Sequence, residues 1–381
     1  MFRGIELFAG GGGLLLGGTK AGVHHEYAAE WNKWACQTIR ENSNAGHPLV
    51  EGVNVLEGDV RNVDWVNLCE PGSIDIVSGG PPCQPFSLGG LSRSANDPRD
   101  MFPAMTSVVK DVKPKVFLVE NVKGLTRKSF SEYFDYINLR LQNPEIQSSE
   151  NEMWDEHYRR LLSESKQSRH SLKYNVKSVV VNAADYGVPQ HRHRVFIVGI
   201  REDLGREWLP PAPTHSGHAL AYLQETGEYW DKYNISSADA RPIRKKAIDD
   251  GLLPWKTVRD ALVGLPDPED STLDLWLDHK YQPGAKAYPG HTGSPIDEPS
   301  KALKAGVHGV PGGENMIRYP DGRVRYFTVR EAARIQTFPD NYALHGAWSE
   351  AMRQLGNAVP VDLASIFIDS VIKSADIESG E

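Results

Sequence analysis

Cys83 is the residue whose type and setting most directly suggest chemistry. It stands in the turn GGPPCQPFS at residues 79–87, after the run SIDIVS, whose β-branched residues predict a buried strand. Two glycines and two prolines end that strand abruptly, which would place a thiol at its carboxyl end, where open α/β sheets bind ligands. A thiolate there is a nucleophile, whereas a lone cysteine in a tight turn is more commonly a buried, unreactive thiol. The polar groups expected at the same edge decide between the two interpretations.

Charged side chains are predicted beside this turn. The run KVFLVENV predicts a strand whose end carries Glu120. The segment QHRHR leads into a further strand, VFIVGI, and strand alternation would put Gln190, Arg192 and Arg194 on one side of the chain. A solvated basic strand edge is the plainer interpretation of these residues. A thiol, a carboxylate and guanidinium groups at one edge would instead be able to attack a substrate and stabilise the charge that develops.

The N-terminal residues predict a nucleotide-binding unit. IELFAGGGGLLLGG is typical of a strand, a glycine turn over residues 10–13 and a helix, and the following strand ends in Glu30. The glycines would let a ligand approach the backbone, and the acid could bind ribose hydroxyls. A purely structural turn fits the pattern about as well, and NAD, FAD and S-adenosylmethionine all stay open as ligands. Asp59, just past a third strand, could contact an adenine or cap a helix.

The elements that would hold these groups form an α/β pattern. Predicted strands alternate with helices through the first 200 residues or so, which favours a Rossmann-like sheet. After Arg201 the chain is rich in proline, glycine and aromatic residues, which indicates a second, smaller domain of irregular or β-rich structure at residues 203–350. The final apolar helix is expected to rejoin the first domain. Residues 1–202 and 351–381 would then form the catalytic and cofactor-binding domain.

Composition limits the cellular setting. The 381 residues include three cysteines, and their formal net charge is -8. Because the cysteines form no CxxC pair, neither a disulfide framework nor a metal site is expected, and a cytoplasmic protein is predicted. No run approaches the roughly 20 apolar residues of a membrane span, and the first predicted strand begins too early for a signal peptide. A monomer is the default expectation, because the final helix already has a place on the sheet.

Basic residues concentrate near the end of the predicted second domain. Between residues 301 and 330 they include Arg318, Arg323 and Arg325, and they outnumber the two acids of this stretch. A glycine-rich loop lies among them, and such a combination suits a phosphate backbone. A solvated loop is the default interpretation, and the alternative is that the three arginines contact such a backbone.

Taken together, these segments resemble the DNA (cytosine-5) methyltransferases. The resemblance covers nearly the whole chain in the order of the family, at FAGGGG, EWN, GDV, GGPPCQPFS, ENV, QHRHR, REAARIQTFPD and GNAVP. The proline-cysteine turn, ENV, the Gln-x-Arg-x-Arg motif and GNAVP are very specific in this order. The resemblance implies a Rossmann-like, S-adenosylmethionine-dependent methyltransferase sheet with a smaller target-recognition domain. The first glycine run is longer than usual for the family, and residues 140–170 look like an insertion.

The resemblance implies a role for each residue of the candidate active site. Cys83 would attack carbon-6 of a cytosine that has been flipped out of the duplex. Glu120 would hold the base at N3 and at its amino group, Arg194 would contact O2, and Arg192 would support Arg194. The charge that develops on the ring would be stabilised by these groups, and carbon-5 would take the methyl group.

The resemblance also implies S-adenosylmethionine as the cofactor. Glu30 would bind its ribose, Trp31 would stack on its adenine and Asp59 would accept from the adenine amino group. The expected cofactor-binding residues are Phe8, Gly10, Gly12, Glu30, Trp31, Asp59, Val60, Pro81, Met101, Asn357 and Val359. The expected DNA-binding residues are Ser87, Gln190, Arg318, Arg323 and Arg325.

Double-stranded DNA is the expected partner, and a cognate restriction endonuclease could act separately on the same sequence. One alternative is a tRNA cytosine-5 methyltransferase, a branch that typically carries a Cys-Phe-Thr tripeptide, but this chain has no cysteine after Cys83. A second is a DNA-binding scaffold without turnover, which would have no chemical need for Cys83, Glu120, Gln190 and Arg194 together. A nicotinamide dehydrogenase would explain the glycine turn but neither the proline-cysteine turn nor the arginines.

Overall fold

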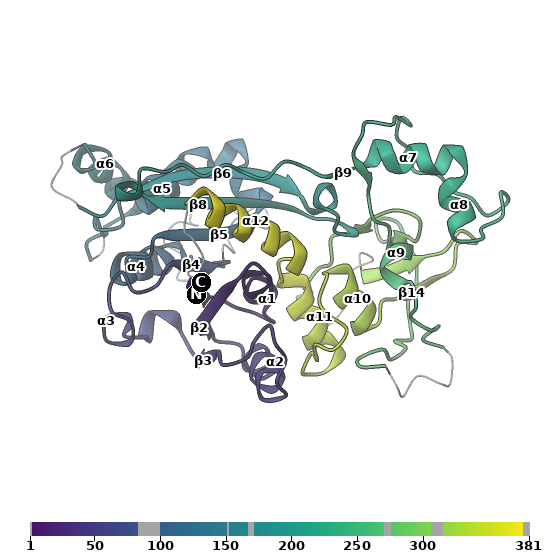
Figure 1. Cartoon of the computed structure of the whole chain (residues 1–381), viewed down its shortest axis with the longest axis horizontal. Coiled ribbons are helices and arrows are strands. Elements are labelled where there is room, and N and C mark those ends of the chain that lie inside the picture. The colour runs from purple at the N-terminus through teal and green to yellow at the C-terminus, as the bar shows by residue number, and fades with distance from the viewer. Residues whose placement is uncertain are drawn as a thin grey trace.

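The computed structural model divides the chain into a large α/β part and a smaller part that projects from it (Figure 1). Two of the predicted site residues, Cys83 and Ser87, lie outside the described residues. The structure describes residues 2–82, 100–150, 152–166, 171–269, 276–305 and 315–375.

A mixed sheet forms the centre of the large part, and seven strands of it lie in the described chain. The first five strands in the chain run parallel to one another, whereas the strand that follows QHR runs antiparallel to both of its neighbours. The parallel strands therefore end at one edge, which positions the candidate site. In sheet order the strands are β3 (Asn54–Glu57), β2 (Val23–Glu30), β1 (Phe2–Leu7), β4 (Ile76–Gly79), β5 (Val116–Val122), β8 (His193–Arg201) and β6 (Tyr174–Asn182).

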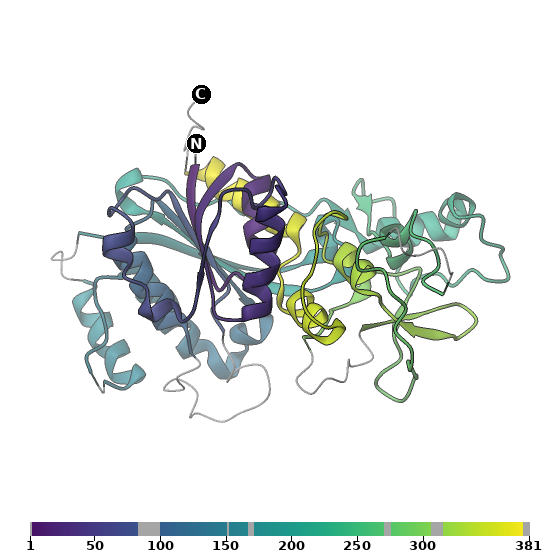
Figure 2. The same cartoon turned by 90° about the horizontal axis from the view of Figure 1, so that it is seen from below.

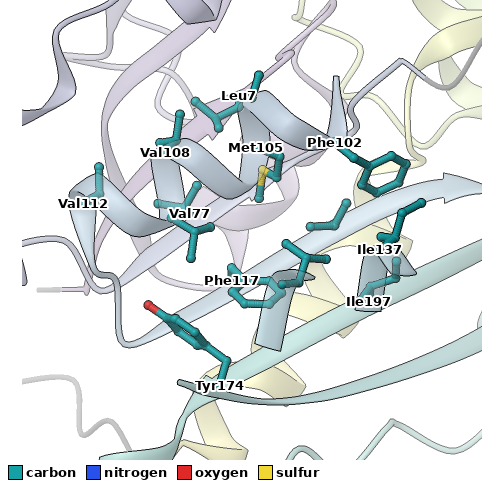
Figure 3. Packing of buried hydrophobic residues seen from close by; sticks show 14 of the residues in the cluster. Leu7, Val77, Phe102, Met105, Val108, Val112, Phe117, Ile137, Tyr174 and Ile197 are labelled. Atoms are coloured by element: carbon teal, nitrogen blue, oxygen red, sulfur yellow. The ribbon is translucent and has the colours of Figure 1, made fainter. Parts of the chain in front are cut away.

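One face of the sheet packs against helices from the first half of the chain. Leu7, Val77 and Phe117, on β1, β4 and β5, point toward Met105 and Val108 of the covering helix α4 in a tightly buried cluster (Figure 3). Alternation along the strands places their neighbours on the opposite face, so both faces are apolar and the strands are buried on both sides. The helices of this part are α1 (Gly13–Lys20), α2 (Lys33–Asn44), α3 (Trp65–Leu68), α4 (Phe102–Val112), α5 (Ser131–Gln142) and α6 (Trp154–Glu164).

The opposite face is covered by α1 and by the C-terminal helix α12 (Val361–Ser374), as Figure 2 shows. Phe367 of α12 stacks on Phe196 of β8 with ring centroids 4.2 Å apart. The stretch Trp348–Ser374 is long and apolar enough by composition to cross a membrane, but 67% of its most apolar 18-residue window is buried inside the protein, and Pro360 interrupts the stretch. It is therefore a core element, and the final helix rejoins the α/β part as predicted.

The smaller part is irregular, as its composition predicts. Its described elements are short helices and strand pairs of two or three residues, so it is less β-rich than expected. These elements are β9 (His215–Ser216), α7 (Gly217–Thr226), α8 (Glu228–Lys232), β10 (Leu253–Pro254), α9 (Val258–Leu262), β11 (Ser294–Pro295), β12 (Ser300–Lys301), β13 (Met316–Arg318) and β14 (Val324–Tyr326). Strand β12 pairs with β7 (Gln190–His191) and joins the two parts.

The segment between the two parts packs on the α/β part. Helices α10 (Val329–Ile335) and α11 (Trp348–Asn357) lie between the sheet and the smaller part in both views (Figures 1 and 2). Tyr342 donates its hydroxyl to the carbonyl of Gly11 at 3.1 Å, and the Asn42 side chain bonds both backbone groups of Ala343. Residues 342 and 343, which the sequence analysis assigns to the second domain, thus contact the α/β part.

Candidate functional site

The turn that precedes Cys83 is fixed from two sides. Asn121, the middle residue of the ENV motif on β5, donates from its side chain to the carbonyl of Pro81 at 2.9 Å. The backbone N–H of Met101 donates to the carbonyl of Pro82 at 3.3 Å. The chain therefore leaves β4 and returns to α4 at one point, beside the end of β5. Cys83 follows Pro82 directly in the sequence and lies outside the described residues.

Glu120 and Arg194 form an ion pair at the same edge. Arg194 Nε lies 2.5 Å from Glu120 Oε1, and only 12% and 9% of the two side chains are exposed. Burial lowers the pKa of Arg194, and the Glu120 carboxylate opposes that effect. The pairing follows from the antiparallel register, which sets Arg194 opposite Val122, two residues beyond Glu120. The fold thus forms a mostly buried ion pair from Glu120 and Arg194, which lie 74 positions apart in the sequence.

Gln190 and Arg192 are buried completely and bond to protein groups. The Gln190 amide donates to Gln336 at 3.0 Å and accepts from the Leu303 N–H at 3.0 Å. The Arg192 guanidinium donates to the carbonyls of Leu303 at 3.1 Å and Gly356 at 2.7 Å. Both side chains are thus held by protein groups, and the DNA contact of Gln190 and the support of Arg194 by Arg192 stay predictions.

The glycine turn after β1 adopts backbone conformations that explain its composition. Gly10 and Gly12 have φ values of 54° and 98°, in the left-handed region that favours glycine. Phe8 has a φ of 56°, which is uncommon for a bulky residue and marks a strained position. A Cβ on Gly13 would lie 2.2 Å from the carbonyl oxygen of Val359, whereas a Cβ on Gly10 would meet nothing within 4 Å. The turn is closed on its C-terminal side and open where a ligand would lie.

Glu30 anchors this turn from the end of β2. Its carboxylate accepts from the backbone N–H of Gly10 at 2.8 Å and from that of Asn32 at 2.7 Å. Burial raises the pKa of Glu30, and these N–H groups oppose the rise. Each carboxylate oxygen can accept a second hydrogen bond, so the group can also take hydroxyl donors from a ligand.

The other expected cofactor residues differ in exposure. Trp31 is 75% exposed, although it follows a buried strand directly. Asp59 caps a short helical turn and pairs with Arg61, with 3.0 Å between Arg61 Nε and Asp59 Oδ2, while Val60 is buried. Asn357 is exposed at the end of α11. An exposed indole beside Glu30 and the open glycine turn forms the kind of surface on which an adenine ring stacks.

Replacing Trp31 by alanine is expected to weaken binding of S-adenosylmethionine by about 5- to 150-fold, since stacking of a base on an aromatic ring contributes about 1–3 kcal/mol. The thermal midpoint should stay near that of the wild type, because the indole is mostly in solvent. Isothermal titration calorimetry checks the affinity. Trp31→Phe should keep most of it, and equal affinities for Trp31→Ala and wild type would contradict the stacking role.

The three arginines expected to contact DNA have different environments. Arg318 is exposed and forms no ion pair with another described residue. Arg323 is exposed and pairs with Asp321 at 2.6 Å. Arg325 is buried, and its two terminal nitrogens donate to the Glu331 carboxylate at 2.7 and 2.6 Å. This corrects the prediction for Arg325, whose charge is held inside the protein.

Arg325→Gln is expected to lower the free energy of unfolding by about 3–5 kcal/mol, because it leaves the carboxylate of Glu331 buried without its cation. Glu331 also caps α10 by accepting from the Thr328 N–H at 2.9 Å, so the loss would loosen that helix start. Urea denaturation followed by fluorescence measures the effect. The exposed Arg323→Gln is the matched control and should change little. Equal midpoints for the two variants would contradict a structural role for Arg325.

A cluster of basic residues in the smaller part was not among the candidates predicted from the sequence. The stretch RPIRKK at residues 241–246 contains Arg241, Arg244 and Lys245, all exposed, and they line a cavity that Arg318 also borders. The local density of positive charge was a visible signal. The sequence gives no sign that this cluster lies near Arg318, because Arg318 follows Lys245 by 73 positions.

Comparisons with known proteins agree with one another. A family model described as C-5 cytosine-specific DNA methylase matches residues 2–145 and 142–373. Type II methyltransferase M.PspPI of Psychrobacter sp. (strain TA137) is 32% identical over 374 residues, which cover 97% of this chain and 78% of that protein. Type II methyltransferase M.Eco47II of Escherichia coli is 32% identical over 377 residues, with coverage of 98% and 79%.

Solved structures share the fold at low identity. The crystal structure of the S. pombe Dnmt2 methyltransferase superposes with a TM-score of 0.58 at 19% identity and covers 98% of this chain and 99% of that one. The Entamoeba histolytica methyltransferase EhMeth gives a TM-score of 0.59 at 14% identity, with coverage of 100% and 99%. At these identities the likeness concerns the fold alone, and it agrees with the predicted α/β methyltransferase sheet.

Proposed function

Since this chain belongs to the C-5 cytosine-specific DNA methylases, we propose that Cys83 is its nucleophile and that Glu120 and Arg194 bind the target cytosine. The enzyme transfers a methyl group from S-adenosylmethionine to carbon-5 of cytosine in DNA, and a covalent intermediate is typical of this family. The observation that carries the residue assignment is the buried ion pair of Glu120 and Arg194 beside the end of β4. Asn121 supports it by holding the turn from which Cys83 follows.

The residues near β1 and β2 fit S-adenosylmethionine. Gly10 leaves open space beside the strand, the carboxylate of Glu30 is fixed by backbone N–H groups, and Trp31 is exposed. Glu30 would bind the ribose hydroxyls and Trp31 the adenine. When bound, the cofactor supplies an electrophilic methyl group on a sulfonium. Val359 would form the opposite wall, because its backbone already contacts the glycine turn.

The active-site residues would raise the reactivity of the base. Cytosine carbon-5 is a weak nucleophile, and addition of the Cys83 thiolate to carbon-6 would make it enamine-like. Glu120 would hold or donate a proton at N3, where negative charge develops, and Arg194 would stabilise the same charge at O2. Carbon-5 would then take the methyl group, and loss of the carbon-5 proton with expulsion of the thiolate would restore the aromatic ring. Both Glu120 and Arg194 are mostly buried, which strengthens their electrostatic effect.

The target base must leave the duplex to reach these groups, at a cost of a few kcal/mol. We infer that the smaller part reads the DNA sequence around it. We place the later boundary of that part near residue 328 instead of 350, because Tyr342 and Ala343 bond to the α/β part. The catalytic and cofactor-binding part would then comprise residues 1–202 and 329–381.

We place the enzyme in the cytoplasm as a monomer and in a restriction-modification setting. The relatives named above are Type II methyltransferases, which supports this setting. A cognate restriction endonuclease would act on the same DNA sequence as a separate protein.

Methyl transfer from labelled S-adenosylmethionine to mixed-sequence duplex DNA tests the proposal. Bisulfite sequencing of the product should find methylated cytosines in one short recurring sequence, and Cys83→Ser should abolish the label. Label in tRNA but not in DNA would contradict the DNA substrate. Bound cofactor without transfer to either nucleic acid would contradict the catalytic assignment of Cys83, Glu120 and Arg194.

A further inference from the structure

A cavity of about 580 Å³ opens between the smaller part and His191 of β7. Its walls come from the segments 241–245, 295–298 and 318–320, together with His191 and Trp255. His191 precedes Arg194 by three residues, so their Cα atoms lie within about 11 Å, at 3.3–3.6 Å per residue. A duplex whose cytosine reached Arg194 would therefore pass close to this cavity.

The walls of the cavity are held rigidly. The buried amide of Gln224 accepts from the N–H of Ile243 at 2.7 Å and donates to the carbonyl of Asp297 at 2.9 Å, which ties two walls to α7. The Asp297 carboxylate accepts hydrogen bonds from Arg259, at 2.6 and 3.1 Å, and from the Tyr229 hydroxyl, at 3.0 Å. Because these partners are internal, the cavity is formed before any ligand arrives.

Lys245 is positioned by packing. Its ammonium lies 4.7 Å from the centroid of the Trp255 ring, and the ring of His191 packs edge-on against the same indole with centroids 4.7 Å apart. A Cβ on Gly217 would lie 2.6 Å from Lys245 Cδ, so the side-chain stem packs against the bare backbone of Gly217 at the start of α7. These contacts keep the Lys245 ammonium beside the Trp255 ring.

The cavity carries an excess of positive charge. Arg241, Arg244, Lys245 and Arg318 are exposed at its walls. The guanidinium groups of Arg244 and Arg318 form no ion pair with any described residue. Such unpaired cations beside a nucleic-acid enzyme's active site suit backbone phosphates, which lysine and arginine neutralise regardless of sequence.

Glu298 is the acid of this cavity that no described cation neutralises through a direct ion pair or hydrogen bond. It is half-buried, burial raises its pKa, and Arg318 and Arg244 oppose the rise. Its carboxylate oxygens are therefore near positive charge yet keep their hydrogen-bonding capacity. A carboxylate in a groove-facing site accepts from the amino group of cytosine, or of adenine, and rejects bases that offer an acceptor there.

We propose that this cavity is a DNA-reading site in which Arg244, Lys245 and Arg318 hold backbone phosphates and Glu298 accepts from an exocyclic amino group of the recognition sequence. The proposal rests on the proposed function, since it needs DNA as the substrate. In protein–DNA interfaces, contacts to phosphates position the duplex and contacts to bases specify the sequence. Here the cations would position the duplex, and Glu298 would specify a base. It also replaces Arg325 as a contact by residues from a segment far away in the sequence.

Arg244→Gln tests the phosphate contact. Fluorescence anisotropy with fluorescent duplex DNA is measured over a series of salt concentrations. The slope of log affinity against log salt should become less steep by about 0.9, and target and non-target duplexes should be weakened equally. The methylated sequence should stay the same. Lys286→Gln removes an exposed cation of the same part outside the cavity and is the matched control.

Glu298→Gln tests whether Glu298 recognises a base of the target sequence. Bisulfite sequencing of a mixed-sequence pool should show that the preference at one base position falls by about tenfold or more, with binding to non-target DNA not weakened. Glu225→Gln, which removes an exposed acid on α7, is the control and should keep the wild-type profile. Circular dichroism verifies that each variant is folded.

The experiments distinguish failure of the proposed function from failure of this inference. If the wild type transfers no methyl group to DNA, the proposed function fails and this inference fails with it. If the wild type is active but Arg244→Gln behaves like Lys286→Gln, the phosphate site is overturned alone. A folded Glu298→Gln variant with an unchanged sequence profile would overturn the reading role of Glu298.

Discussion

Cys83→Ala is expected to lower methyl transfer to DNA by a factor on the order of 10⁴ or more, as loss of a nucleophile does in other covalent enzymes. The affinity for S-adenosylmethionine should remain, because the expected cofactor residues lie on β1 and β2. The turn should also persist, since its described bonds involve Asn121 and the carbonyls of Pro81 and Pro82 instead of a thiol. Single-turnover transfer of label and calorimetry of cofactor binding measure the two effects separately.

The other two cysteines supply matched controls. Cys36 and Cys69 are buried, and burial raises the pKa of their thiols to about 12 and about 11. Both therefore stay protonated and unreactive near neutral pH. Cys69→Ala should keep the wild-type kcat once its fold is verified. Retention of more than a tenth of wild-type activity by Cys83→Ala would exclude Cys83 as the nucleophile.

A trapped adduct tests the bond itself. In DNA that carries 5-fluorocytosine at the target, carbon-5 has fluorine in place of the proton that must leave after methylation. Addition of the thiolate and methyl transfer can proceed, but the fluorine cannot leave as a cation and the adduct stays covalent. The wild type should form a complex that survives denaturing electrophoresis, and Cys83→Ala should form none. An adduct that persists in Cys83→Ala would assign the bond to another residue.

The sheet and the location of the site could be predicted because their signals are local. Runs of β-branched residues gave the strands, and glycines and prolines gave their ends. The topological rule that parallel strands present ligands at their carboxyl ends then brought Glu30 and Glu120 to one edge. The glycine run was predicted to let a ligand approach the backbone. Gly13 also makes room for the backbone of Val359, which lies hundreds of positions later and could not be foreseen from the local pattern.

Whether a given charged side chain is buried or exposed could not be predicted, because this depends on which groups pack against it in the folded protein. Arg325 and Arg318 occur within one basic stretch and look alike in the sequence, yet one is buried against Glu331 and the other is exposed. Arg192 and Arg194 differ in the same way: the first binds carbonyls in the core, and the second meets Glu120. Alternation along a strand gives the side on which a residue lies but not what covers that side.

Glu120→Gln is expected to lower kcat by about 10²- to 10⁴-fold, the range for loss of a general acid–base group. The amide cannot exchange a proton with N3, and it leaves the Arg194 guanidinium, 12% exposed, without its anion. Cofactor affinity should not change. Glu30→Gln is the matched contrast at the same sheet edge: it should raise the KM for S-adenosylmethionine with a smaller effect on kcat. A variant Glu120→Gln that altered only cofactor affinity would contradict the assignment.

A double variant shows whether the pair acts as a unit on the base. If Glu120 and Arg194 stabilise one developing charge, Arg194→Gln should cost activity on its own, and Glu120→Gln/Arg194→Gln should lose little more than the worse single variant. The double variant also removes the buried, unpaired guanidinium that Glu120→Gln leaves, so its stability should recover relative to that variant. Losses in kcat that multiply would instead mean that the two groups act at independent steps, and the proposed shared role at N3 and O2 would be wrong.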